Sequence, residues 1–238
     1  LGLVAAPEDA EAGDADAIPV VLIALDTSGS MEYLDVADGL VIGRVLARID
    51  ALGLREETIV IFQSDHGHST EARAFYGGGS SGPYRGAKFS LLEGGIRVPA
   101  AIRWPGRVPA GEARGPMVTG CDWFPTIAHY CGVALDDDAV DGRSLHRVIR
   151  SGSAESPHAE FHWGNERYWA VRVGRWKLIA NARETTVGRN HHDEEGLALY
   201  DVMADPGERN NRAAEEPAVV ADLLERHEGW WESNGASR

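Results

Sequence analysis

The chain has 238 residues, 43% of them hydrophobic, so it can bury one large core or two small ones. Its 37 acidic and 23 basic residues give a net charge of −14, which excludes a surface built for nucleic acid or anionic membranes. No apolar run approaches the ~20 residues that a membrane-spanning helix needs. These numbers describe an acidic globular protein, in which a site for an anion needs a local group of positive charges.

The first 17 residues form an acidic stretch that begins with Leu and contains no Lys or Arg. Such a segment has too little apolar surface to fold by itself, and its start lacks the basic beginning of a signal peptide. We therefore expect residues 1–17 to be an acidic linker or the cut end of a longer protein.

The elements that follow predict an α/β fold. Val20 to Leu25 is a continuous apolar run of strand length, typical of a parallel strand covered on both faces. A helix follows, with Asp38 as its N-cap and Gly53 just beyond its C-terminus. Its apolar positions recur at helical spacing, at Ile42, Val45, Leu46, Ile49 and Leu52. Because a second apolar strand, Ile59 to Phe62, comes directly after this helix, we expect a mostly parallel sheet flanked by helices.

A loop dense in Gly, Ser and Arg separates this strand from the next, between residues 66 and 97. Loops of this length within a compact domain are usually functional or disordered, and the predicted strands on both sides favour a functional loop. A strand is expected at Val98 to Trp104, where Pro99 indicates the start of the strand or an edge position. The turn Trp104-Pro-Gly106 ends it.

A helix is predicted at residues 121–131, with Asp122 near its start. Cys121 and Cys131 stand ten positions apart in it. That spacing separates them by ~15 Å along a helix, which is too far for a disulfide. We expect both to be buried free thiols.

The last part of the chain changes to alternating patterns. Residues 169–179 form two short alternating runs around Gly174-Arg175, which predicts an antiparallel hairpin. A third strand is expected at residues 197–202 and a closing amphipathic helix at residues 217–231. This part therefore predicts a small antiparallel sheet with a closing helix.

Two segments of the chain carry the residue types of a metal-assisted anion site. Asp65 and His66 directly follow an apolar strand, and the chain turns there, so both side chains can converge on one ion. The glycine-rich loop then brings a single lysine, Lys88, back toward this pair, and its compact charge suits a tetrahedral anion. His68 could line the same pocket.

With these motifs the chain resembles the sulfatases of the alkaline-phosphatase superfamily. The motifs that carry the resemblance are, in chain order, Ser64-Asp65-His66-Gly67, Tyr84-Arg85-Gly86-Ala87-Lys88, Glu93-Gly94-Gly95-Ile96-Arg97-Val98-Pro99, Arg103-Trp104-Pro105-Gly106, Asp122-Trp123-Phe124-Pro125-Thr126, Asp141-Gly142-Arg143-Ser144-Leu145, Val173 to Ile179 and Leu199 to Glu208. The order of so many motifs makes the resemblance specific.

The resemblance implies an alkaline-phosphatase-like α/β fold and the hydrolysis of sulfate esters. It implies that Asp65 and His66 bind a divalent cation and that Lys88 binds the sulfate of a small-molecule or carbohydrate ester. The family's usual metal is calcium, and the imidazole ligand leaves manganese open. Family members are often periplasmic, secreted or lysosomal, and the compartment of this chain stays open.

In the family, an N-terminal segment supplies the remainder of the site. It carries two further metal-binding acids and a Cys or Ser, in the pattern C/S-x-P-x-R, that is oxidised to formylglycine and attacks the sulfur. This chain has no counterpart of that segment, so we expect it to be the C-terminal half of an enzyme, inactive alone and with the missing segment as a partner. Its parts would be the linker at 1–17, a partial sulfatase α/β domain at 18–160 and a C-terminal antiparallel-sheet subdomain with a closing helix at 161–238.

Two alternatives stay open. A phosphodiesterase or phosphonate monoester hydrolase of the same superfamily would use the same scaffold. From another class, Asp26-Thr-Ser-Gly-Ser30 resembles the metal-ion-dependent adhesion site of von Willebrand A domains, in which an Asp and two Ser hold magnesium. That alternative predicts magnesium-dependent protein binding that is lost on Asp26→Ala.

Overall fold

A computed structural model of the chain describes residues 20–24, 41–71, 79–136, 139–164, 167–186 and 192–234. The chain divides into two compact units. Within the described ranges, the first unit comprises residues 20–24, 41–63 and 100–158, and the second comprises residues 64–99 and 159–234. The domain boundaries expected from the sequence stay a prediction, and the expected linker and the Asp38 N-cap lie outside the described residues.

The first unit holds a three-stranded sheet in the order β1-β2-β3. β1 (Val20–Ala24) and β2 (Ile59–Gln63) pair in parallel, as expected, whereas β3 (Ala100–Arg103) pairs antiparallel to β2. β3 forms one edge of the sheet among the described strands. This position fits Pro99 directly before it, because proline cannot donate a ladder hydrogen bond. The predicted α/β class is confirmed, with an antiparallel strand at this edge.

α1 (Val41–Ala51) ends where the sequence predicts, at Gly53. The Leu54 N–H donates to the Ile49 carbonyl and the Gly53 N–H donates to the Asp50 carbonyl, both at 3.1 Å, which is a Schellman motif. Gly53 has a φ of +74°, which glycine adopts without the Cβ clash of other residues. The motif stops the helix and turns the chain toward β2.

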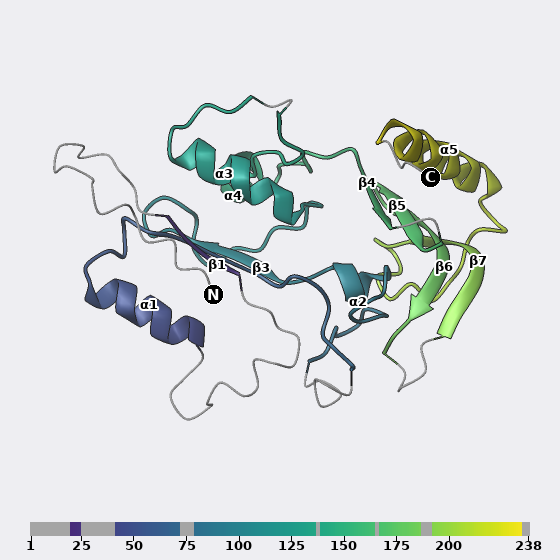
Figure 1. The fold of residues 1–238 in the computed structure, drawn as a ribbon, viewed down its shortest axis with the longest axis horizontal. Coiled ribbons are helices and arrows are strands. Elements are labelled where there is room, and N and C mark those ends of the chain that lie inside the picture. Colours follow the sequence, from purple (N-terminus) through teal and green to yellow (C-terminus); the bar gives the residue numbers. More distant parts are fainter. Residues whose placement is uncertain are drawn as a thin grey trace. The chain divides into compact units, whose positions relative to one another are not determined.

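One face of this sheet is covered by a 3-10 turn, η4 (Gly120–Asp122), that continues into α3 (Trp123–Tyr130). Ile59 and Ile61 of β2 are fully buried on this side, together with Trp104. α4 (His146–Arg150) contacts α3, and α1 lies on the other side of the sheet (Figure 1). β2 is therefore covered by helices on both faces, as its continuous apolar run predicts.

Cys121 and Cys131 are both free, as predicted, but both are exposed, so the expectation of buried thiols is wrong. Cys121 lies in the turn before α3, and Cys131 is the residue at its C-cap. The buried positions of this helix are instead Pro125, Thr126 and Ala128. Neither cysteine belongs to the set that packs inward, because both stand at the ends of the helix.

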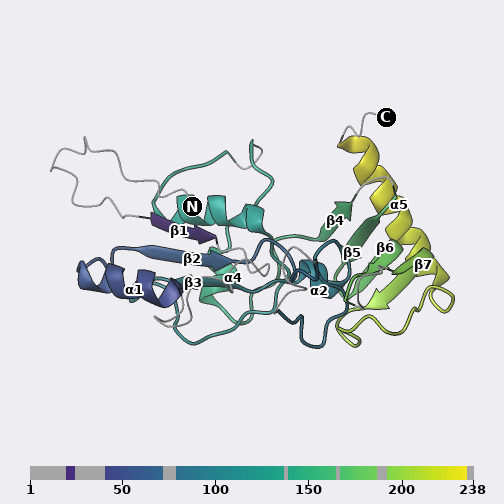
Figure 2. The same cartoon turned by 60° about the horizontal axis from the view of Figure 1, so that its bottom comes forward.

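The second unit contains a four-stranded antiparallel sheet with the strands in sequence order. Its strands are β4 (Glu160–Gly164), β5 (Trp169–Val173), β6 (Trp176–Glu184) and β7 (His192–Asp201). β5 and β6 form the predicted hairpin, in which Val173 pairs with Trp176 and Gly174 has a φ of +55°. The predicted closing helix is α5 (Pro217–Ser233), which packs on β5 and β6 (Figure 2). Neither α5 nor any other helix in the described part of the chain is long and apolar enough to cross a membrane.

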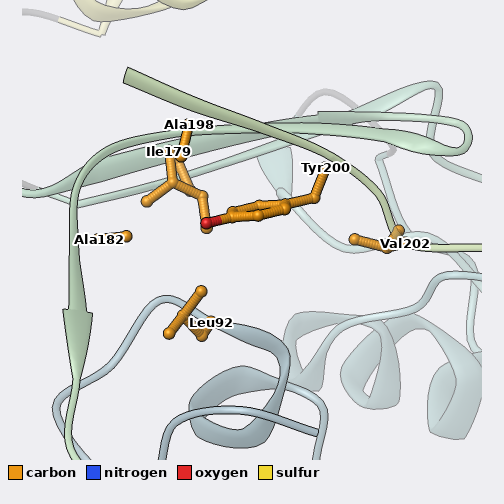
Figure 3. Close-up of a cluster of buried hydrophobic side chains, with 7 residues drawn as sticks. Leu92, Ile179, Ala182, Ala198, Tyr200 and Val202 are labelled. Carbon is orange, nitrogen blue, oxygen red and sulfur yellow. The ribbon is translucent and has the colours of Figure 1, made fainter. Parts of the chain in front are cut away.

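The two faces of this sheet bury separate apolar clusters. The cluster under α5 consists of Val171, Leu178, Leu199 and Leu223. On the opposite face, Tyr200 and Ile179 pack against Leu92, which comes from the long loop (Figure 3). Because Leu92 is fully buried there, this second cluster fastens the loop that carries Lys88 onto the sheet.

Aromatic rings around two buried histidines join α5 to β4 and β5. His162 of β4 and His227 of α5 approach with their Nδ1 atoms 3.2 Å apart. Trp230 stacks on His162 and Trp169 stacks on His227, with ring centroids 4.8 and 4.2 Å apart. Burial lowers the pKa of both imidazoles; Glu160 only partly offsets this at His162, and His162 itself adds to it at His227.

This histidine pair predicts that the second unit loses stability in mild acid. Unfolded imidazoles titrate near pH 6.5, whereas the folded pair takes up protons only at lower pH, so the folded state binds fewer protons in between. The free energy of unfolding should therefore have its full value above pH 6.5 and decrease as the pH falls below it.

Urea unfolding at about pH 7.5 and about pH 5.5 measures this loss. The His227→Gln variant should lose less stability between the two pH values than the wild type does. An equal loss in the wild type and in His227→Gln would contradict the argument.

Candidate functional site

Asp65 and His66 lie in the segment that follows β2. The buried Ser64 fixes the start of this segment, because its N–H donates to the Pro99 carbonyl at 3.1 Å and its hydroxyl donates to the His66 carbonyl at 2.8 Å. The Asp65 side chain is 56% exposed and the His66 side chain is 25% exposed, so both can reach a bound ligand. The His66 Nε2 lies 3.1 Å from the Asp65 Oδ2. The two residues predicted to bind metal therefore meet.

The hydrogen bond at one nitrogen of His66 determines what the other can do. Nδ1 lies 2.7 Å from the Gly67 carbonyl oxygen, which only accepts, so Nδ1 carries the proton. In the neutral imidazole Nε2 then presents a lone pair, and this lone pair faces the carboxylate of Asp65. Two electron-rich atoms at this separation are stabilised by a proton or a cation between them. Neighbouring ligands of one cation lie about as far apart, given bond lengths of about 2.0–2.4 Å.

The loop behind this pair packs backbone against backbone, which explains its repeated glycines. The Gly67 N–H donates to the Gly95 carbonyl at 2.9 Å. A Cβ on Gly67 would lie 2.0 Å from the Gly94 oxygen, and a Cβ on Gly94 would lie 2.1 Å from the Gly86 oxygen. Neither position has room for a side chain. The same holds for Gly95, whose Cβ would lie 2.1 Å from the Ser90 oxygen, so both glycines of α2 (Glu93–Ile96) are required by this packing.

Lys88 returns to the same segment through its backbone, because its N–H donates to the His68 carbonyl at 3.0 Å. Its side chain is 17% exposed, and its ammonium lies 3.2 Å from Glu71 Oε2. The preceding residue, Ala87, donates its N–H to the Thr185 hydroxyl at 2.8 Å, just beyond β6. The loop thus delivers a cation beside the segment that carries the metal-ligand candidates, and a carboxylate accompanies that cation.

Arg85, in the same motif as Lys88, has a structural role. Its guanidinium donates to the Glu208 carbonyl at 2.6 Å, to Glu184 at 3.1 Å and to Glu194 at 2.5 Å. Burial lowers the pKa of Arg85, but the bonds to Glu194 and Glu184 raise it by more, so the group stays charged. Arg85 therefore ties the loop to the β-sheet of the second unit.

A buried ion cluster holds the other end of the loop. Lys177 of β6 is fully buried, with its Nζ 3.0 Å from Glu93 and 2.9 Å from Glu208. Glu93 also faces Arg97 at 3.5 Å and Arg172 at 3.7 Å. Burial raises the pKa of both carboxyls, but Lys177 and the arginines bring the pKa of Glu93 below its usual value, while the pKa of Glu208 stays raised.

The motif residues alone do not identify this cluster. The one signal in the sequence is that Lys177 lies two positions before Ile179 in the same strand, so both side chains point to the same, buried face of the sheet. A lysine at such a position is rarely buried unless it is paired. Glu93 and Glu208 both stand in motifs shared with the sulfatases, where they read as turn and loop residues.

The predicted site residues are brought together in part. Asp65 and His66 touch, and Lys88 joins their segment at its backbone, but its ammonium contacts Glu71. Within the described ranges, no three side chains of metal-binding type come together. Burial lowers the pKa of His68, whose Nδ1 is buried without a hydrogen-bond partner. The assignment of Asp65, His66 and Lys88 to one site stays a prediction.

One further stretch, Ser81 to Arg85, has the form S-x-P-x-R, which is the pattern that carries the nucleophile in the sulfatase family. The Ser81 hydroxyl is shared between the carbonyls of Tyr84 at 2.9 Å and Gly86 at 3.2 Å. Ser81 therefore closes the turn that leads to Lys88. This hydroxyl has a structural role, and we assign it no part in catalysis.

Two family models match the chain. The sulfatase model matches residues 28–133, and the model of the N-sulphoglucosamine sulphohydrolase C-terminal region matches residues 87–228. The first match includes Asp65 and His66, and both include Lys88. The adhesion-site alternative at Asp26–Ser30 lies outside the described residues, and these matches give it no support.

Individual proteins agree with the family models. Steryl-sulfatase of Mus musculus is 38% identical over 211 residues, which cover 77% of this chain and 34% of that protein. A solved structure of a Bacteroides thetaiotaomicron protein of glycosaminoglycan metabolism has a TM-score of 0.66 at 29% identity, over 79% of this chain and 42% of that chain. The phosphonate monoester hydrolase of Agrobacterium radiobacter shares the fold alone, with a TM-score of 0.52 at 23% identity, over 78% of this chain and 37% of that chain.

The chain thus spans about a third of the length of the curated relative and about two fifths of the solved chains. The match to the C-terminal family model covers more than half of this chain, from residue 87 to 228. The chain therefore belongs to the sulfatase family of the alkaline-phosphatase superfamily.

Proposed function

We propose that the complete protein hydrolyses sulfate esters and that this chain supplies Asp65, His66 and Lys88 to its active site. One observation carries the proposal. The His66 Nε2 faces the Asp65 Oδ2 at 3.1 Å while its Nδ1 is committed to the Gly67 carbonyl. This arrangement is favourable when one cation binds both atoms, and divalent cations are what the sulfatase family uses.

The donor set fits a divalent cation. Asp65 would bind it through Oδ2 and His66 through Nε2, while the Gly67 carbonyl holds the ring in the required tautomer. We propose calcium, the usual metal of the family, with manganese as the alternative because an imidazole suits a softer ion. Such a metal, when bound, polarises a sulfate oxygen.

Lys88 would balance the negative charge of the sulfate group. Its ammonium lies 3.2 Å from Glu71, and the Ser69 hydroxyl donates to the same carboxylate at 3.3 Å. The carboxylate shows that an anionic oxygen is accommodated beside Lys88, and an ammonium has three N–H groups to donate. A sulfate oxygen can therefore join Glu71 around the ammonium or take its place.

The nucleophile and the other metal ligands are assigned to parts of the complete protein outside this chain. Catalysis requires all of these groups in one geometry, so the chain alone is expected to be inactive. We propose a small-molecule or carbohydrate sulfate ester as substrate, since the relatives above are a steryl-sulfatase and a protein of glycosaminoglycan metabolism. We also propose that the chain divides into a partial α/β domain at 18–160 and a C-terminal subdomain at 161–238.

Metal titration of the complete protein tests the proposal, because the remaining metal ligands are assigned to parts outside this chain. Calcium and manganese, added separately and followed by calorimetry, should bind to the wild type. Asp65→Asn and His66→Gln should each weaken binding at least about tenfold, because each removes a ligand atom. The matched control is Asp50→Asn, which removes a carboxylate paired with Arg55 in the first unit and should leave binding unchanged.

The Asp65→Asn substitution should also lower the turnover of sulfate esters by the complete protein. Asp65→Asn is expected to reduce kcat/KM for an aryl sulfate by about a hundredfold, because it weakens the binding of the cation that would stabilise the charge on the sulfate. A wild type that binds neither metal, or a control that loses binding equally, would contradict the assignment of the site. Much faster cleavage of phosphonate monoesters or phosphodiesters than of sulfate esters would decide for the alternative within the superfamily.

A further inference from the structure

Phe89, the residue after Lys88, combines two unfavourable features. Its φ is +73°, in the left-handed region that large side chains avoid. Its side chain is also exposed, at 54% of its surface, so burial does not offset the strain. The other non-glycine residues described with a positive φ are Asn181, a type that tolerates it, and Glu208, which is held by the buried ion cluster.

The conformation of Phe89 is imposed by a rigid turn. The Ser90 N–H donates to the Ala87 carbonyl at 3.0 Å, which makes Phe89 the third residue of a β-turn, where a positive φ favours glycine. The turn is anchored on both sides, because the Ala87 N–H donates to Thr185 at 2.8 Å and the Ser90 hydroxyl donates to the Arg183 carbonyl at 2.6 Å. The exposed ring thus projects from buried neighbours.

The ring lies beside the proposed sulfate-binding group. The Lys88 Nζ is 5.3 Å from the centroid of the Phe89 ring. An aromatic face held next to an anion-binding ammonium contributes apolar contact area at the place where the alcohol part of a sulfate ester must lie. Strained residues that persist in a well-anchored framework are concentrated at functional sites.

We propose that Phe89 is a specificity-determining residue that forms the apolar wall for the ring bearing the sulfate ester. This inference rests on the proposed function. The substrate class is a sulfate ester on a ring with an apolar face, which both aryl or steroid rings and pyranoses provide. A flexible alkyl sulfate lacks such a face, so Phe89 discriminates against it.

Phe89→Gly in the complete protein tests this assignment. The substitution removes the wall and also relieves the backbone, so the melting temperature should stay the same or rise. The KM for an aryl sulfate and for a sulfated monosaccharide should increase at least about fivefold, while the KM for an alkyl sulfate stays unchanged. The size of the two increases distinguishes an aryl from a sugar preference. Phe89→Tyr retains a ring and should keep the wild-type KM.

Phe124→Ala is the matched control, because Phe124 is 59% exposed on α3 of the first unit and should not affect KM. A Phe89→Gly variant with unchanged KM values, or with equal increases for ring and alkyl sulfates, would overturn the inference and leave the proposed function intact. A lower melting temperature for Phe89→Gly would also overturn it, because the ring would then be packed within the complete protein. A wild type that cleaves none of the three sulfate esters would overturn the proposed function itself.

Discussion

Replacing Lys177 by Met is expected to lower the free energy of unfolding by about 3–5 kcal/mol, the usual effect of breaking a buried ion pair from one side. The ammonium lies 3.0 Å from Glu93 and 2.9 Å from Glu208, and none of the three side chains is more than 1% exposed. Without the ammonium, two carboxylates would remain in the interior without the cation between them. Methionine fills most of the volume, so the effect reports the charge and not a cavity.

Urea unfolding at neutral pH, followed by tryptophan fluorescence, measures the loss, because Trp169 and Trp176 lie in the same sheet as Lys177. Arg226→Met is the control, because Arg226 pairs with Asp222 at 3.0 Å in an exposed position and its loss should lower stability far less. Adding Glu208→Gln to Lys177→Met should restore part of the stability by removing one uncompensated charge. A loss no larger than that of the control would show that the cluster does not hold the loop.

Replacing Asp122 by Ala should lower the free energy of unfolding of the first unit by about 2–4 kcal/mol, because buried donors are left without acceptors. Asp122 is fully buried. Its Oδ2 accepts the Thr119 N–H at 2.8 Å, and its Oδ1 accepts the Arg143 N–H at 2.8 Å and lies 2.7 Å from the His158 Nε2. One carboxylate therefore joins the start of η4 to two segments that come later in the chain.

Comparing the thermal and urea unfolding of Asp122→Ala with that of Asp141→Ala separates this role from a general effect of removing an acidic residue. Asp141 is exposed in the loop next to Arg143, so its substitution should change stability by less than about 0.5 kcal/mol. Asp122→Asn keeps one acceptor oxygen and should fall between the two. If both alanine variants unfold alike, the three contacts of Asp122 do not contribute as argued.

Most elements of both units could be predicted because their signals are local, whereas the short elements β4 and α2 were not predicted. Glycine at position 53 ends α1, and glycine at position 174 turns β5 into β6, as the sequence predicts. The apolar run of β2 predicts burial on both faces, which the fold confirms. The antiparallel pairing of β3 was not predictable in the same way, because the direction of a strand depends on the course of a long connection.

The candidate site was predictable to the extent that its residues are neighbours in sequence. Asp65 and His66 are adjacent, and the turn after β2 brings their side chains together at 3.1 Å. The contact of Lys88 with Glu71 could not be predicted, because it depends on how the glycine-rich loop folds back. The positive φ of Phe89 likewise follows from anchors on both sides of its turn.

The sequence by itself thus determined most of the helices and strands, the family and the segment that carries the metal-ligand candidates. Only the tertiary structure decided which polar groups are buried together. Lys177 and Glu93 are separated by 84 positions, and His162 and His227 by 65, so no local pattern relates them. Secondary structure follows from the preferences of neighbouring residues, whereas the burial of a charge is favourable only when distant segments supply its partners.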